Sequence, residues 1–101
     1  MSRMGLICCL IIRGRVQQVG YRAWTERAAL KRSVQGWVRN RSDGTVEAMF
    51  TGLPEAVEAM IEACRQGPPG ARVEAIELRA STHDDYDLCR PGELFSVLPT
   101  V

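Results

Sequence analysis

The sequence predicts an α+β fold in which two helices cover one face of a mainly antiparallel sheet. Three observations support this prediction. The apolar run at residues 6–12 is nearly continuous, as in a strand that is covered on both faces. Apolar residues recur at helical spacing within residues 22–32 and again within residues 54–66. The remaining apolar segments are short, alternate with polar residues, and are separated by turn residues.

The first helix is expected over residues 22–32, with Trp24, Ala28 and Leu30 directed toward the core. A β-hairpin should follow, because residues 34–39 and 45–51 alternate and the turn between them ends in Asp-Gly. The two faces of the second hairpin strand hold Val46, Ala48 and Phe50 on one side, and Thr45, Glu47 and Met49 on the other.

Pro54 suits the first turn of the second helix, and the GPPG sequence at residues 67–70 ends that helix. Its apolar stripe is Val57, Met60, Ile61 and Cys64. A less regular strand is expected at residues 73–78, and a short last strand at residues 94–98. The resulting order, βαββαβ with an appended fifth strand, is the ferredoxin-like arrangement.

Length and charge set broad limits on the function. A chain of 101 residues is expected to form one domain that spans residues 1–101. The first 50 residues hold nine Lys and Arg against three acids, and the remainder hold four against nine. A basic half favours anionic partners, although two solvated faces of one fold would give the same asymmetry. Arg15, Arg39 and Arg41 either make a cleft positive and attract the substrate or are simply exposed, and we expect exposure.

The cysteines and the single histidine do not predict a metal site. The four cysteines are Cys8, Cys9, Cys64 and Cys89, and they lack the close pairing of a zinc motif. His83 lies among Asp84, Asp85 and Asp87, a polar run that is typical of a solvated loop. We therefore expect no metal, no cofactor, and reduced, buried or half-buried thiols in a cytoplasmic protein.

The first residues resemble the start of a signal peptide, because Arg3 precedes the apolar run. However, Arg13 and Arg15 follow at once, and no small-residue cleavage site is present. The run is also too short to cross a bilayer. The expectation is a cytoplasmic protein without a membrane partner.

Residues 14–22, GRVQQVGYR, connect the first strand to the first helix. This stretch is either an ordinary turn or a loop that holds an anion. Glycines permit a backbone that directs successive N–H groups inward, and a helix start adds further unpaired N–H groups. Arg22 adds a planar guanidinium that suits phosphate oxygens.

Residues 36–52, GWVRNRSDGTVEAMFTG, form a second pattern. Together the two stretches resemble the signatures of the acylphosphatase family, the first of which is a G-x-V-Q-G-V-x-[FY]-R-like loop. The matching positions are Gly14, Val16, Gln17, Val19, Tyr21 and Arg22, then Gly36, Trp37, Val38, Arg39, Asn40, Gly44, Val46 and Gly52. The resemblance covers nearly the whole chain and includes the ending FSVLPT.

The resemblance implies hydrolysis of the carboxyl–phosphate bond of acyl phosphates to carboxylate and inorganic phosphate. It implies that Arg22 and loop amides hold the phosphoryl group, while Asn40 orients the attacking water. The phosphate-binding amides would be those of Gln17, Gln18, Val19, Gly20 and Tyr21. Inorganic phosphate or sulfate is expected as a site ligand, and the chain is expected to act as a monomer without nucleic acid.

Two other functions stay open on the sequence. The same loop would serve a non-catalytic module that binds a phosphorylated metabolite. Gln18 supports this alternative because the family usually has glycine at this position. A left-handed backbone would strain Gln18 by about 1–2 kcal/mol. An RNA-binding domain is the second alternative, but it needs aromatic residues exposed on central strands, where the sequence offers Phe50 on an apolar face.

Overall fold

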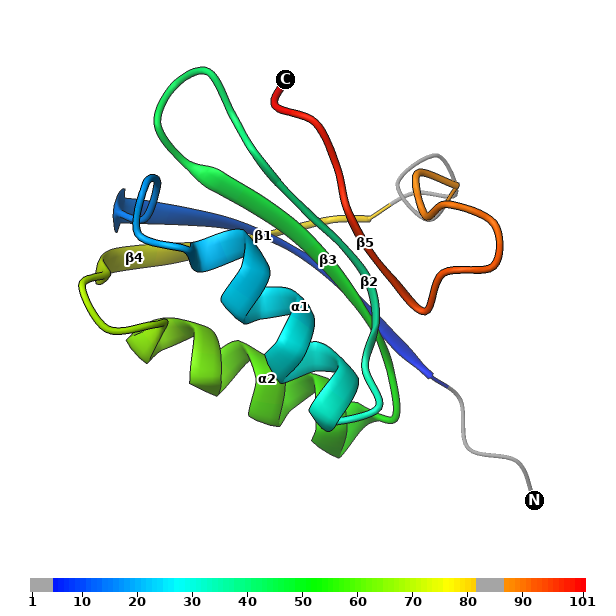
Figure 1. Ribbon diagram of the computed structural model, residues 1–101. Coiled ribbons are helices and arrows are strands. Elements are labelled where there is room, and N and C mark those ends of the chain that lie inside the picture. Colours follow the sequence, from blue (N-terminus) through cyan, green and yellow to red (C-terminus); the bar gives the residue numbers. More distant parts are fainter. Residues whose placement is uncertain (1–4, 82–86) are drawn as a thin grey trace.

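The computed structural model describes residues 5–81 and 87–101, and it forms a helical layer on a sheet (Figure 1). The elements are β1 (Leu6–Arg15), α1 (Tyr21–Lys31), β2 (Gln35–Asn40), β3 (Val46–Gly52), α2 (Pro54–Gln66), β4 (Arg72–Arg79) and β5 (Phe95–Val97). Both helices lie on the same face of the sheet, whose strand order is β4-β1-β3-β2-β5. The predicted α+β, ferredoxin-like fold with a short fifth strand is confirmed. The polar run at residues 83–85 lies outside the described residues.

Strand β1 lies inside the sheet and pairs antiparallel with β3 on one side and β4 on the other. Strand β2 completes a hairpin with β3, and β5 pairs parallel with β2. After β5 the chain continues along β2, where Leu98 N donates to Val38 O and Val101 N donates to Asn40 O. The end of β2 is therefore held from both sides.

Two apolar clusters cover the two faces of the sheet. The larger lies under the helices and includes Leu10, Ile12, Val38, Ala48, Phe50, Val57 and Met60. The smaller lies on the open face and consists of Cys9, Trp37, Met49 and Leu98. Because neighbouring strand residues point to opposite faces, both sets of residues from the apolar strands are buried.

Helix α1 departs in part from the predicted packing. Its buried residues are Tyr21, Thr25, Ala28 and Ala29. Ala28 is confirmed and Trp24 is half-buried against the core, but the prediction for Leu30 is wrong, since 46% of that residue is exposed. Thr25 tolerates burial because its hydroxyl donates to the Tyr21 carbonyl at 2.8 Å. The buried stripe therefore follows Thr25 and Ala29, and Leu30 turns toward solvent.

Strand β1 extends three residues further than the apolar run predicts. The extension reaches Arg15 by pairing with β4 through a register shift between Arg13 and Gly14. Gly14 has φ of +128°, and a Cβ there would collide with the carbonyl of Arg72. Gly14 therefore serves a β-bulge at the strand end, and the loop proper is confined to residues 16–20.

None of the four cysteines forms a disulfide, and their burial is as expected: Cys9 and Cys64 are buried, while Cys8 and Cys89 are half-buried. Burial raises the pKa of the Cys64 thiol to about 12, so the thiol stays protonated near neutral pH. Among the residues that the structure describes, no helix combines the length and the apolar composition that crossing a bilayer requires.

Candidate active site

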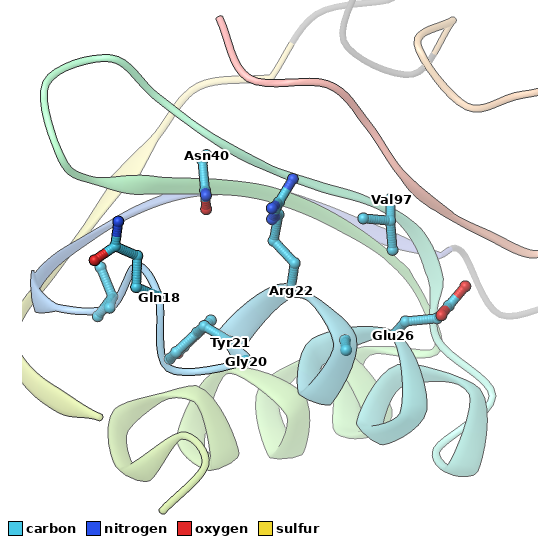
Figure 2. A pocket seen from close by; sticks show the side chains of 9 residues that line it. Gln18, Gly20, Tyr21, Arg22, Glu26, Asn40 and Val97 are labelled. Atoms are coloured by element: carbon cyan, nitrogen blue, oxygen red, sulfur yellow. The ribbon is translucent and has the colours of Figure 1, made fainter. Parts of the chain in front are cut away.

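A pocket of about 460 Å³ lies where the 16–20 loop, the start of α1 and the end of β2 meet (Figure 2). It is lined by Val16, Gln18, Gly20, Tyr21, Arg22, Ala23, Glu26, Asn40 and Val97. The Arg22 side chain rises from α1 toward the end of β2, where Asn40 lies (Figure 2). The structure thus brings together the two side chains that the sequence assigned to one site.

Arg22 occupies the second position of α1, whose N-cap is Gly20. Gly20 has φ of +78°, no side chain caps the helix, and the first turn contains no acidic residue. The first intrahelical bond runs from Trp24 N to Gly20 O at 3.0 Å. The helix start therefore presents uncapped N–H groups and a partial positive charge beside Arg22.

The main-chain amides of residues 17–20 have no acceptor within residues 5–81 and 87–101. Gln18 has φ of +62° and Gly20 has φ of +78°, so the loop turns twice through the left-handed region. Such turns curl a backbone and gather its N–H groups into an anion-binding concavity. The arrangement is chemically suited to an oxyanion, and Gln18 bears a strain of about 1–2 kcal/mol to maintain it.

The other predicted loop residues divide into two groups. Gln18, Gly20 and Tyr21 line the pocket, whereas Gln17 and Val19 are not among its lining residues. The Val19 side chain packs against the core. The Gln17 side chain instead donates two hydrogen bonds to the β2–β3 turn, to Arg41 O at 2.8 Å and Thr45 O at 2.9 Å. No local sequence signal distinguishes this contact from an exposed glutamine.

Asn40 is the last residue of β2, and its backbone pairs with Val46. Its side-chain amide has no partner within the described ranges, and the same holds for the Arg22 guanidinium. Asn40 is half-buried at the pocket wall. An amide can donate to and accept from one water, so this group can orient a nucleophile beside an oxyanion.

Tyr21 anchors the helix start rather than contributing a free hydroxyl. Its Oη donates to the main-chain oxygen of Cys64 at 2.6 Å, and its ring lies 5.4 Å from that of Trp24 between centroids. Burial raises the pKa of the Tyr21 hydroxyl, so it stays a neutral donor. A Cβ on Gly67 would lie 2.7 Å from the Tyr21 ring, so the ring needs a glycine there.

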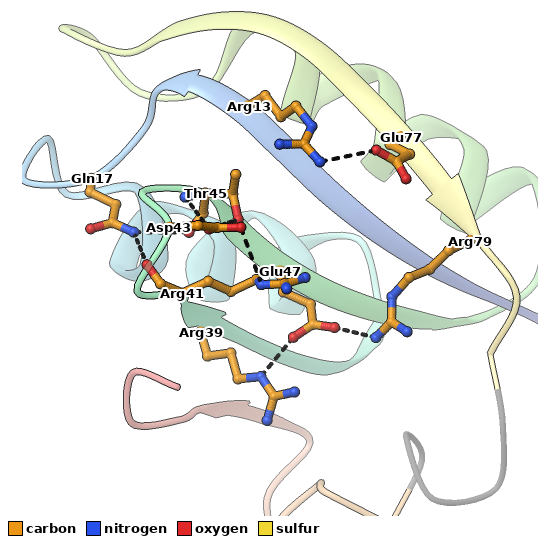
Figure 3. Close-up of polar contacts among 9 residues, drawn as sticks. All are labelled: Arg13, Gln17, Arg39, Arg41, Asp43, Thr45, Glu47, Glu77 and Arg79. Atoms are coloured by element: carbon orange, nitrogen blue, oxygen red, sulfur yellow. Dashed lines mark hydrogen bonds and ion pairs between the residues drawn. The ribbon is translucent and has the colours of Figure 1, made fainter.

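The open face of the sheet holds a separate group of charges (Figure 3). The prediction of an exposed Arg39 is wrong: its side chain is 18% exposed, donates to Glu47 at 2.8 Å, and lies over the Trp37 ring. Glu47 is itself buried and also pairs with Arg79. Arg41 is half-buried, and Arg39 and Arg41 line a hollow on this face, not the pocket that contains Arg22.

No group of three or more His, Cys, Asp or Glu that could hold a metal ion occurs in the part of the chain that the structure describes. Glu26 is the one carboxylate among the described residues that line the pocket, and it lies further along α1 beyond Arg22 (Figure 2). The donors gathered at the pocket are amides and a guanidinium, which suit an anion rather than a cation.

Comparisons with known proteins identify the family of this chain. The acylphosphatase family model matches residues 8–88. An acylphosphatase of Bradyrhizobium diazoefficiens is 53% identical over 92 residues, which cover 91% of this chain and 93% of that protein. One from Nitrobacter winogradskyi is 55% identical over the same shares of both chains. The crystal structure of acylphosphatase from Bacillus subtilis matches with a TM-score of 0.78 and 34% identity, covering 94% of this chain and 99% of that one. The chain therefore belongs to the acylphosphatase family, whose enzymes hydrolyse acyl phosphates.

Proposed function

We propose that this chain hydrolyses acyl phosphates in the pocket between the 16–20 loop and Asn40. The observation that carries the proposal is the shared pocket of Arg22 and Asn40 beside a run of unpartnered loop amides. Each part supplies a different need of the reaction: an anion cradle, a permanent positive charge, and a group that positions water.

The amides of residues 17–21 and the Arg22 guanidinium hold the phosphoryl group. The N–H groups at the uncapped start of α1 add to the loop donors, and Arg22 can bind two phosphate oxygens at once. Phosphoryl transfer spreads negative charge over the equatorial oxygens, so donors already aimed at them lower the barrier without reorganisation.

Asn40 orients the water that attacks phosphorus. The new P–O bond forms to the water oxygen while the P–O bond to the acyl oxygen breaks, and the bonding pair leaves with the carboxylate. A carboxylate is a stable leaving group and needs no protonation. An oxygen of the substrate phosphoryl group accepts the water's proton, and the products are a carboxylate and inorganic phosphate.

The structure gives no support to the RNA-binding alternative. Stacking of bases on a sheet needs exposed aromatic rings. Phe50 and Trp37, on the described strands, are both completely buried, one under the helices and one on the open face. The basic character of the first half of the chain is explained in part by the ion pairs of Arg13 and Arg39.

We infer that the chain acts as a single domain and as a monomer, because its length of 101 residues and its 25% charged composition fit a small domain that folds alone. Four cysteines outside any disulfide fit a reducing compartment such as the cytoplasm. Sedimentation or light scattering of the purified protein tests the monomer.

The decisive experiment measures release of inorganic phosphate from acetyl phosphate and benzoyl phosphate, in EDTA without added metal. We expect turnover of both, and much slower turnover of an alkyl phosphate monoester, whose alkoxide is a poorer leaving group. Inorganic phosphate should inhibit competitively. A folded protein that binds phosphate but releases none from either substrate would support the non-catalytic alternative instead.

A further inference from the structure

We propose that Gln17 is a positioning residue whose side chain sets the place of Asn40 relative to the 16–20 loop. This inference rests on the proposed function, because it assigns Gln17 an effect on the water-orienting group. It gives the Gln17 side chain a role of its own, separate from the phosphate binding that the proposed function assigns to the main-chain amide.

The contact joins two segments that are far apart in the sequence (Figure 3). Gln17 Nε2 donates to Arg41 O at 2.8 Å and to Thr45 O at 2.9 Å. An amide nitrogen has two N–H groups, so both are committed to the turn. The side-chain nitrogen of Gln17 therefore has no donor left for substrate, and both of its hydrogen bonds connect the loop to the turn.

The two acceptors bracket Asn40. Arg41 follows Asn40 directly, and Thr45 precedes Val46, the residue that pairs with Asn40 in the sheet. On the other side, the Asn40 carbonyl accepts from Val101 N at 3.1 Å. Asn40 thus sits between the chain end and the turn, and Gln17 links that turn to the loop that precedes Arg22.

The turn does not need Gln17 for its own hydrogen bonds. Arg41 O also accepts from Gly44 N at 3.1 Å, and Thr45 O also accepts from Arg41 N at 2.9 Å. The side chain of Asp43 further accepts from Thr45 N at 3.0 Å. Removing the Gln17 amide leaves neither carbonyl unpaired, so the main consequence is a change in position rather than unfolding.

A positioning role predicts a specific kinetic pattern. The phosphoryl cradle depends on the loop backbone and Arg22, whereas the water depends on Asn40. Loosening the link between them should lower kcat while leaving phosphate affinity nearly intact, since a misplacement of about 1 Å can lower a rate about 100-fold.

Gln17→Met tests this pattern, because methionine has a similar length but cannot donate. We expect kcat to fall at least about 10-fold, with the inhibition constant of inorganic phosphate within about 3-fold of wild type. Gln17→Glu also lacks the donors and should lose at least as much. Gln35→Met, at the exposed start of β2, is the matched control and should keep the wild-type kcat. A Gln17→Met variant with wild-type kcat, or one whose phosphate affinity falls as much as its kcat, overturns the proposal.

Combining Gln17→Met with Asn40→Ala separates an effect through Asn40 from an independent one. If Gln17 acts through Asn40, the double variant is as fast as Asn40→Ala alone. If the fall in kcat of the double variant equals the product of the falls in the two single variants, the proposal is overturned.

A second readout does not depend on turnover. The side-chain NH₂ signals of Asn40 in an NMR spectrum of the free protein should shift or broaden in Gln17→Met and remain unchanged in Gln35→Met. Unchanged Asn40 signals in Gln17→Met refute the positioning role even if acyl phosphates are hydrolysed. If the wild type does not hydrolyse acyl phosphates, the proposed function is refuted. The NMR spectrum still shows whether the Gln17 side chain positions Asn40.

Discussion

The hydroxyl of Tyr21 donates to the main-chain carbonyl of Cys64 at 2.6 Å, which ties the first residue of α1 to the last turn of α2. In a continuing helix the Cys64 carbonyl would accept from the amide of residue 68. That residue is Pro68, which has no N–H. Tyr21 therefore satisfies a carbonyl that the helix itself leaves unpaired, and at the same time fixes the helix start that carries Arg22.

Tyr21→Phe should destabilise the fold by about 1–3 kcal/mol, because it removes the donor and leaves the buried Cys64 carbonyl unpaired. The ring keeps its packing against Gly67, so the loss isolates the hydrogen bond. Urea unfolding followed by tryptophan fluorescence measures the change. A wild-type midpoint and slope would show that water replaces the hydroxyl without cost.

Gln18→Gly should leave kcat/KM at or above the wild-type value. Glycine adopts φ of +62° without a Cβ clash, and the loop amide remains available to the phosphoryl group. Gln18→Val, with a β-branched side chain at the same φ, should lower both activity and stability. A large loss of activity in Gln18→Gly would mean that the Gln18 side chain takes part in the reaction.

Arg22→Ala should lower kcat/KM by about 100- to 1,000-fold, as removal of one main donor from a charge-stabilising site does. It should also abolish the rise in melting temperature that inorganic phosphate gives the wild type. Arg22→Lys retains the charge without the two-pronged geometry and should recover part of the rate. Arg27→Ala, an exposed arginine on the same helix, is the control and should match wild type.

Asn40→Ala should lose most of its kcat and still bind inorganic phosphate. The loop and Arg22 bind the phosphoryl group on the proposed function, whereas Asn40 orients only the water. Asn40→Asp should lose phosphate affinity as well, since it places a negative charge beside the bound anion. Isothermal titration with phosphate and steady-state kinetics separate the two effects. Normal turnover in Asn40→Ala would remove the water-orienting role.

Glu47→Gln should destabilise the fold by about 3 kcal/mol without lowering kcat, because it breaks a buried ion pair on the face away from the pocket. The Glu47 side chain is 3% exposed and is shared by Arg39 and Arg79. Glu77→Gln is the matched control. It breaks an ion pair in which the Arg13 side chain is 50% exposed and the Glu77 side chain 57% exposed, so we expect the free energy of unfolding to fall by less than about 1 kcal/mol. Equal losses of unfolding free energy in Glu47→Gln and Glu77→Gln would show that burial does not strengthen the Glu47 ion pairs.

Local patterns in the sequence were sufficient for the element order, whereas Arg22 and Asn40 were predicted as site residues because the two motifs resemble the acylphosphatase signatures. Strand and helix periodicity depend on neighbouring residues, and each motif places Arg22 or Asn40 at the end of one element. A left-handed backbone at Gln18 was also predictable as a possibility, because glycine is usual there in the family that the motif resembles. The sheet then brings the two motifs together, since β1 and β2 both pair with β3.

Contacts between distant segments were decided by the tertiary structure alone. Glu47 is buried between two arginines, and Gln17 donates to Arg41 and Thr45. Neither set of contacts follows from a helical or strand repeat in the sequence. The same is true of Leu30, whose exposure follows from which face of α1 meets the sheet. A sequence pattern reports which residues prefer to be buried, whereas the free energy of a polar contact depends on a partner that only folding supplies.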